Sequence, residues 1–129
     1  MIRVVAGIVE QNGRVLICQR PASGTFGGKW EFPGGKMRPS ETPREALERE
    51  LREELDVPSA IGELAATARH RYAEMADAVR VLFLRATLQR APRNVASERM
   101  VWARRGELRR YDFLAADLGV IAALVRGEI

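Results

Sequence analysis

One helical segment lies between two groups of strand-like segments, and this order restricts the chain to a mixed α/β architecture. Residues 42–57 repeat apolar side chains at helical spacing: Ala46, Leu47, Leu51 and Leu55. Thr42, Pro43 and Glu45 form the pattern of a capping box with proline in the first helical turn. Pro58 cannot continue a helix, so the sequence predicts a helix over residues 42–57.

The segments on both sides of this helix have the composition of strands and turns. Before it, we expect strands over residues 2–9 and 15–18 joined by a turn at 11–13, a loop over 21–28 and an extended piece over 30–32. After it, we expect a hairpin or meander from residues 61–72 and 78–88, a loop over 90–96, a short strand over 100–102 and a helix over 114–125. This order of elements predicts an α/β fold, in which helices pack on the faces of a mixed sheet.

Length and composition favour an ordinary globular protein. The 129 residues predict one domain over residues 1–129, with 47% hydrophobic and 29% charged residues. No signal-peptide pattern and no membrane-length apolar run is present, so we expect a cytoplasmic protein with no membrane partner. The net charge is +4 and comes almost entirely from arginine. Arginine suits phosphate ligands, although a GC-rich gene would also enrich it.

Three carboxylates share one face of the predicted helix. Glu50, Glu53 and Glu54 follow i, i+3, i+4 spacing, and like charges at that spacing repel one another. A hard divalent cation with oxygen ligands would relieve the repulsion. A Pro33-Gly34-Gly35 turn lies upstream, where backbone can approach a ligand closely. The alternative is a solvated acidic face balanced by arginines of the same helix.

The segment from Gly35 to Val57 resembles the Nudix box, G-x5-E-x7-R-E-U-x-E-E-x-G-U, where U is aliphatic. Eight of the nine defined positions match: Gly35, Glu41, Arg49, Glu50, Leu51, Glu53, Glu54 and Val57. Asp56 replaces the last glycine, and it tolerates the left-handed conformation of a helix end less well than glycine does. Residues 19–21, 30–36, 70–72 and 113–117 also resemble MutT-type members, so the resemblance covers most of the chain.

This resemblance implies the Nudix fold, an α/β/α sandwich around a mixed sheet. It also implies Mg²⁺-dependent hydrolysis of a nucleoside triphosphate to a nucleoside monophosphate and pyrophosphate, by attack on the β-phosphorus. The last helix then begins near Leu118, after a loop, with Asp117 as its N-cap. 8-oxo-dGTP, CTP and 5-methyl-dCTP are candidate substrates.

The resemblance also assigns roles to the acidic residues. Mg²⁺, or Mn²⁺, would bind Glu53 and Glu54 with Glu50 and the Gly34 carbonyl nearby, bridge phosphate oxygens, and acidify or orient the attacking water. Glu50 is the expected general base, and Arg49 and Glu41 would brace the site. Glu98 is a candidate further ligand, since Ala96 occupies the position where that glutamate is expected; Glu98 can equally be a surface residue.

Four residues are expected to bind the nucleotide. Arg20 and Lys36 would clamp the phosphate chain, Phe32 would form an apolar or stacking wall, and Asp117 would contact the edge of the base. An ionised Asp117 only accepts hydrogen bonds, and a protonated one also donates. Phe32 can instead be plain core and Asp117 only a cap. His70 and Tyr72 can line the pocket, although a lone strand histidine is usually structural.

Two other functions remain open. One keeps the chemistry but uses ADP-ribose or a dinucleoside polyphosphate as substrate. The other is a non-catalytic module that senses a nucleotide or binds nucleic acid. The intact acidic triad argues against a binding module, and no aromatic residues alternate with basic ones as in RNA-binding surfaces. We therefore expect a nucleotide substrate and no stable nucleic-acid partner, in a monomer or homodimer.

Overall fold

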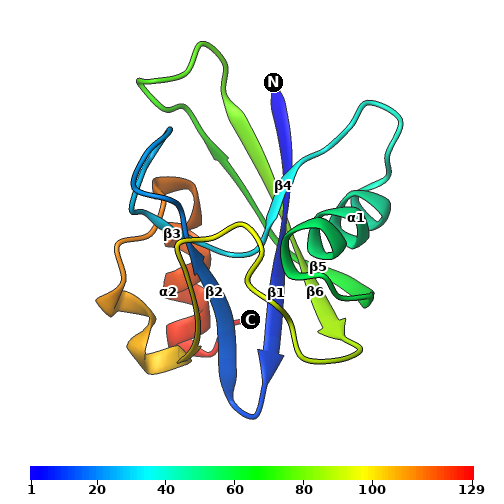
Figure 1. Cartoon of the computed structure of the whole chain (residues 1–129). Helices are drawn as coiled ribbons and strands as arrows, with labels where there is room; N and C mark the ends of the chain where they lie inside the picture. Colours follow the sequence, from blue (N-terminus) through cyan, green and yellow to red (C-terminus); the bar gives the residue numbers. More distant parts are fainter.

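The computed structural model describes residues 1–129, which form a mixed sheet with an α-helix on each side (Figure 1). The elements in chain order are β1 Ile2–Gln11, β2 Arg14–Gln19, β3 Trp30–Glu31, β4 Gly34–Lys36, α1 Pro43–Leu55, β5 Ser59–His70, β6 Val79–Leu88, β7 Arg99–Arg104, the 3-10 helices η1 Arg105–Arg110 and η2 Ala115–Asp117, and α2 Leu118–Arg126. No helix is long and apolar enough to cross a membrane.

The sheet has the order β3-β2-β1-β6-β5, while β4 also pairs with β1 and β7 also pairs with β2. The β1 and β6 strands run parallel, and the other pairs are antiparallel. A parallel pair needs a crossover connection, and the chain between β1 and β6 includes α1. The strand β1 is therefore central: it pairs with β2, β4 and β6.

Each face of the sheet has its own apolar core. Successive side chains of a strand point to opposite faces, so Val5 and Val9 of β1 pack in the core that contains the leucines of α1. Ala6 and Ile8 pack in the other core, which contains the apolar side of α2. This layered arrangement confirms the predicted α/β/α sandwich.

The helix α1 begins as the sequence predicts. Thr42 Oγ1 accepts a hydrogen bond from the Glu45 amide at 3.2 Å, and Glu45 Oε1 accepts one from the Thr42 amide at 2.9 Å. The helix ends at Leu55, two residues before the predicted end, because Asp56 adopts the left-handed conformation with φ 50° and ψ 46°. Asp56 thus occupies the conformation for which the Nudix box has glycine.

Three other features differ from the predictions. Residues 34–36 form β4 because they pair with β1, and residues 105–110 form a 3-10 helix that no sequence signal indicated. The helix α2 begins at Leu118 with Asp117 at the N-cap position, as predicted, but without the capping hydrogen bond that such a residue usually makes. Asp117 is the last residue of η2, has helical φ and ψ angles, and makes no capping hydrogen bond.

Candidate active site

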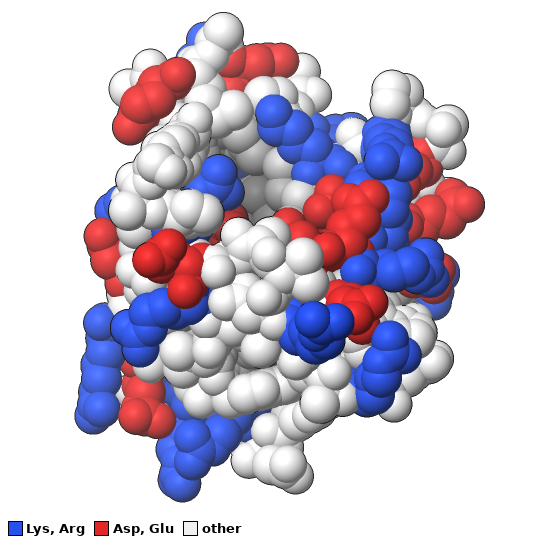
Figure 2. Space-filling view, viewed as in Figure 1, with Lys and Arg blue, Asp and Glu red and all other residues white.

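A cavity of about 480 Å³ opens between β4, the loop over residues 21–28, and the η2 segment. Figure 2 shows a hollow in this region, with acidic and basic side chains on its rim. The cavity brings together residues from distant parts of the chain. Six of the predicted site residues line it: Arg20, Phe32, Gly34, Lys36, Glu54 and Asp117.

The two glycines of β4 allow close packing at the floor of the cavity. A Cβ atom on Gly34 would collide with the Val5 carbonyl of β1. A Cβ atom on Gly35 would lie 2.6 Å from the Glu50 carboxylate. The Glu50 side chain therefore lies directly against the β4 backbone, and a larger residue at position 35 would displace the Glu50 carboxylate.

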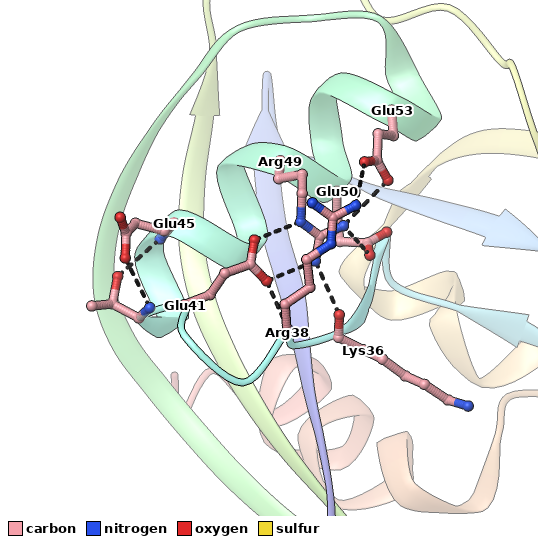
Figure 3. Close-up of polar contacts among 8 residues, drawn as sticks. Lys36, Arg38, Glu41, Glu45, Arg49, Glu50 and Glu53 are labelled. Carbon is pink, nitrogen blue, oxygen red and sulfur yellow. Dashed lines mark hydrogen bonds and ion pairs between the residues drawn. The ribbon is translucent and has the colours of Figure 1, made fainter.

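Arg49 connects the carboxylates of the Nudix-box segment (Figure 3). Its guanidinium donates two hydrogen bonds to Glu41, from Nε at 2.6 Å and from Nη2 at 2.8 Å. It also donates to Glu50 at 2.9 Å, to Glu53 at 3.2 Å and to the Lys36 carbonyl at 3.1 Å. The two hydrogen bonds from Arg49 to Glu41, together with one from the Arg38 amide, lower the pKa of Glu41 to about 2. Glu41 is thus a fixed anion that orients Arg49.

Glu54 has different surroundings on the same helix. It makes no ion pair, and its only polar contact is a long hydrogen bond of 3.4 Å from the Gly34 amide. Burial raises its pKa to about 8, and the charges of Glu50 and Glu31 act in the same direction. The pocket side of α1 therefore carries an acidic group whose ionised form has no cationic partner in the protein.

The donor set suits a hard divalent cation. Glu54, Glu50 and the Gly34 backbone offer oxygen atoms only, which Mg²⁺ prefers. No three acidic, histidine or cysteine side chains are preassembled as a complete ligand set, because Glu50 and Glu53 are bonded to Arg49. Mg²⁺ usually retains several waters and needs only one or two carboxylates, so the residues present fit this ion.

Glu31 is a site residue that the sequence reasoning missed. It lines the cavity and accepts a hydrogen bond from Arg20 Nη1 at 3.0 Å. Burial raises its pKa, and the Arg20 charge opposes the shift. Arg20, which the sequence predicted to bind the phosphate chain, also donates a hydrogen bond to the Thr25 carbonyl at 3.0 Å. Glu31 and the Thr25 carbonyl therefore hold the Arg20 guanidinium in place. A charged residue between the buried aromatics Trp30 and Phe32 is the signal that could have identified Glu31.

Asp117 lies at the inner end of the cavity and is 4% exposed. Burial raises its pKa to about 8, with a further contribution from the charge of Glu31, while the Phe32 amide opposes the shift. At neutral pH its carboxyl group is therefore largely protonated. A protonated carboxyl both donates and accepts hydrogen bonds.

Aromatic side chains form the apolar walls. Phe32 lines the cavity and also packs in the core against Phe83 and Phe113, with ring centroids 5.9 and 5.7 Å apart. Tyr72 lines the cavity, packs against Phe26 at 4.6 Å, and accepts a hydrogen bond from the Ala116 amide at 2.9 Å. This last bond connects the end of β5 to the η2 turn that carries Asp117.

Six sequence candidates do not line the cavity: Glu41, Arg49, Glu50 and Glu53, which form the cluster around Arg49, and Glu98 and His70. Glu98 is exposed and precedes β7; its amide bonds to the Gln19 carbonyl at 2.9 Å, and its side chain makes no ion pair. Glu98 is thus not part of the cavity lining that contains Glu54. His70 packs against Tyr72 at 4.5 Å and does not line the cavity.

Comparison with known proteins matches the family model described as "NUDIX domain" over residues 4–123. The chain belongs to the Nudix family. Among solved structures, the E. coli ORF135 protein has a TM-score of 0.87 and 32% identity, covering 99% of this chain and 91% of that one. The MutT protein of Methanosarcina mazei Go1 shares the fold, with a TM-score of 0.86 and 20% identity over 98% of this chain and 94% of that one.

Curated Nudix relatives include MutT-type enzymes. The "CTP pyrophosphohydrolase" of E. coli K12 is 52% identical over 67 residues, which are 52% of this chain and 50% of that protein. The "Putative 8-oxo-dGTP diphosphatase 2" of Mycobacterium tuberculosis H37Rv is 36% identical over 95% of this chain and 87% of that protein. The match to the first of these spans only half of the relative's length. These findings confirm the predicted family and its MutT type.

Proposed function

We propose that the protein is a magnesium-dependent hydrolase that converts a nucleoside triphosphate to a nucleoside monophosphate and pyrophosphate. The observation that carries the proposal is that Glu54 and Asp117 line the same cavity. We assign metal binding to Glu54 and recognition of the base to Asp117. The names of the MutT-type relatives support the triphosphate as substrate. ADP-ribose and dinucleoside polyphosphates are the alternative substrates.

The chain's own residues would divide the work as follows. Glu53 and Glu54 hold Mg²⁺ with Glu50 and the Gly34 carbonyl, and the ion supplies positive charge to the phosphate oxygens. Glu50 accepts the proton of the attacking water, and Arg49 holds the Glu50 carboxylate in position at 2.9 Å. Lys36 contacts the phosphate chain from the cavity wall. The Glu41–Arg49 pair keeps the cluster in one arrangement.

The chemistry of Asp117 is compatible with the bases of the candidate substrates. A largely protonated carboxyl matches a base edge with one donor beside one acceptor. Cytosine presents such an edge with its amino group and ring nitrogen, and 8-oxoguanine presents one with its N7–H and O8. CTP-type and 8-oxo-dGTP-type substrates therefore both satisfy the pocket chemistry, and Phe32 provides the adjoining apolar wall.

A panel of triphosphates tests the proposal. Initial rates with Mg²⁺ are measured for the common nucleoside triphosphates, 8-oxo-dGTP, 5-methyl-dCTP, ADP-ribose and a dinucleoside polyphosphate. We expect one triphosphate to be strongly preferred, and Asp117→Ala to change the ranking while leaving the Mg²⁺ dependence intact. Turnover of ADP-ribose alone would contradict the triphosphate assignment, and no turnover of any compound would contradict catalysis.

Isotope-labelled water tests the position of attack. Attack on the β-phosphorus places the label of ¹⁸O-water in pyrophosphate, whereas attack on the α-phosphorus places it in the nucleoside monophosphate. We expect the label in pyrophosphate, with mass spectrometry of both products as the readout.

A further inference from the structure

Three arginines lie side by side on neighbouring strands. Arg3 of β1 is opposite Arg80 of β6, and Arg80 is opposite Arg69 of β5. Residues directly opposite each other in a sheet point to the same face. We refer to Arg3, Arg69 and Arg80 as the arginine row.

The row lies on the α1 face of the sheet, beyond the area that α1 covers. The neighbours of Arg80 along β6, Val79 and Val81, pack in the core on the α2 face, so Arg80 points to the other face. All three arginines are exposed. Strands lie about 4.8 Å apart, so the row extends over roughly 10 Å.

No acidic side chain neutralises the arginine row. None of its three members forms an ion pair. By contrast, Arg85 of β6 is paired with Glu63 of β5 at 3.5 Å. Like charges directly opposite each other destabilise a sheet. An anionic ligand at the row would therefore relieve the repulsion among the three guanidinium groups.

A smaller hollow joins the row to the active-site cavity. This hollow, of about 260 Å³, is lined by residues 1–3 and 36–39 and contains no acidic residue. Lys36 lines both this hollow and the main cavity, and Arg3 and Arg38 line the hollow. Figure 2 shows basic side chains gathered between the N-terminal end of β1 and the loop that follows β4.

We propose that the arginine row and this hollow bind a linear phosphate chain that extends outward from the active-site cavity. Arginine binds phosphate oxygens through two parallel hydrogen bonds, and a row of three suits a ligand with regularly repeated negative charges. No exposed aromatic residue belongs to the row or to the hollow, so a ligand of phosphates fits better than one with bases to be stacked. The inference rests on the proposed function, because one end of the phosphate chain is taken to lie in the active-site cavity.

The test measures binding of inorganic polyphosphate in the presence of a metal chelator, by calorimetry and by the shift in melting temperature. We compare tripolyphosphate, which the hollow can hold, with a longer linear polyphosphate. We expect the longer chain to bind more tightly, and Arg69→Gln/Arg80→Gln to weaken its binding by about tenfold or more. Tripolyphosphate binding should change little in this variant, because Lys36, Arg3 and Arg38 remain.

The chain offers a matched control. Arg14 of β2 and Arg104 of β7 are also opposite each other and exposed, but they line neither hollow. Arg14→Gln/Arg104→Gln removes the same charge and should bind the longer chain as the wild type does. Equal losses in both double variants, or no loss in the row variant, would overturn the proposal.

Three further outcomes separate this proposal from others. A single-stranded oligonucleotide that binds through the row more tightly than polyphosphate would overturn the assignment of the ligand. Turnover of a nucleoside triphosphate, together with unchanged binding of the longer polyphosphate in the row variant, would overturn this inference and leave the proposed function standing. Binding of polyphosphate by the row without turnover of any nucleotide would contradict the proposed function instead.

Discussion

Glu50 and Glu54 lie one turn apart on α1, yet their surroundings give them different chemistry. Glu50 is fixed by Arg49 and lies against Gly35. Glu54 is half-buried and makes no ion pair, and desolvation together with the charges of Glu50 and Glu31 raises its pKa to about 8. This difference supports Glu54 as a metal ligand and Glu50 as the proton acceptor, because only Glu54 lacks a positive charge that the metal would supply.

Replacement of Glu54 tests this assignment. Glu54→Gln keeps the size of the side chain and removes the charge, so we expect turnover to fall by at least about 100-fold. The fold should be retained, because the half-buried Glu54 carboxylate makes no ion pair that the substitution would remove. Circular dichroism and the melting temperature in chelator check the fold. Near-normal turnover in the variant would contradict the ligand assignment.

Asp117 predicts how stability depends on pH. Its pKa rises from the ordinary aspartate value of 3.8 to about 8 in the folded protein, so between these values the folded state binds more protons than the unfolded state. Stability in chelator should therefore fall as the pH rises through this window. Asp117→Asn cannot ionise, so it should show a shallower decline in urea unfolding between about pH 5 and pH 8.

The control for this prediction is Glu54→Gln, since Glu54 titrates in the same window. Each single variant should remove part of the decline, and the double variant should remove more than either. A wild-type slope in Asp117→Asn would mean that Asp117 is ionised in the folded protein at neutral pH.

At the scale of elements, the site depends on the contact between α1 and β4. The strand β4 pairs with β1 through Gly34–Lys36, and the glycines let Glu50 and Glu54 approach its backbone. Arg49 fastens the two elements together through the Lys36 carbonyl. The order of helix and strand therefore places the acidic groups at the cavity that the β4 backbone lines.

The end of α1 gives a prediction of stability. Asp56 adopts φ 50°, a conformation that is unfavourable for residues with a Cβ atom, and its ion pair with Arg93 is exposed and contributes little. Asp56→Gly should raise the free energy of unfolding by up to ~1 kcal/mol. Asp56→Ala should lower it. Urea unfolding measures both variants, and equal stabilities of the two would contradict the role of the left-handed conformation.

Local signals in the sequence predicted α1 well, and non-local contacts explain what the sequence missed. The capping box and the leucine spacing are encoded within a few residues, so the helix and its acidic face could be predicted. The absence of a cap at Asp117 could not, because η2 is held by the Tyr72 hydroxyl, 44 residues away in sequence. Glu31 was missed because its enclosure and its bond to Arg20 depend on the pairing of β2 with β3.

At the scale of the whole molecule, the two layers on either side of the sheet meet at the cavity. The core on the α1 side positions the acidic cluster, and the core on the α2 side positions Phe32 and places η2, with Asp117, at the cavity. The lining of the cavity carries the acidic residues Glu31, Glu54 and Asp117 together with the basic residues Arg20 and Lys36. The site thus depends on both layers of the fold.

Metal binding should stabilise the whole molecule. Mg²⁺ would supply a positive charge beside Glu54 and would bind the folded state but not the unfolded one. The melting temperature should therefore rise with the Mg²⁺ concentration. The increase should disappear on chelation and be much reduced in Glu54→Gln. Arg14→Gln, a charge change away from the cavity, should keep it. An equal increase in Glu54→Gln would place the ion elsewhere.

The most direct test of the proposed reaction is a quantitative product analysis of the preferred triphosphate in Mg²⁺, with wild-type protein and Glu54→Gln side by side. We expect nucleoside monophosphate and pyrophosphate in equal amounts from the wild type, and a loss of both in the folded variant. Nucleoside diphosphate and orthophosphate as products, or equal rates from both proteins, would contradict the proposed reaction.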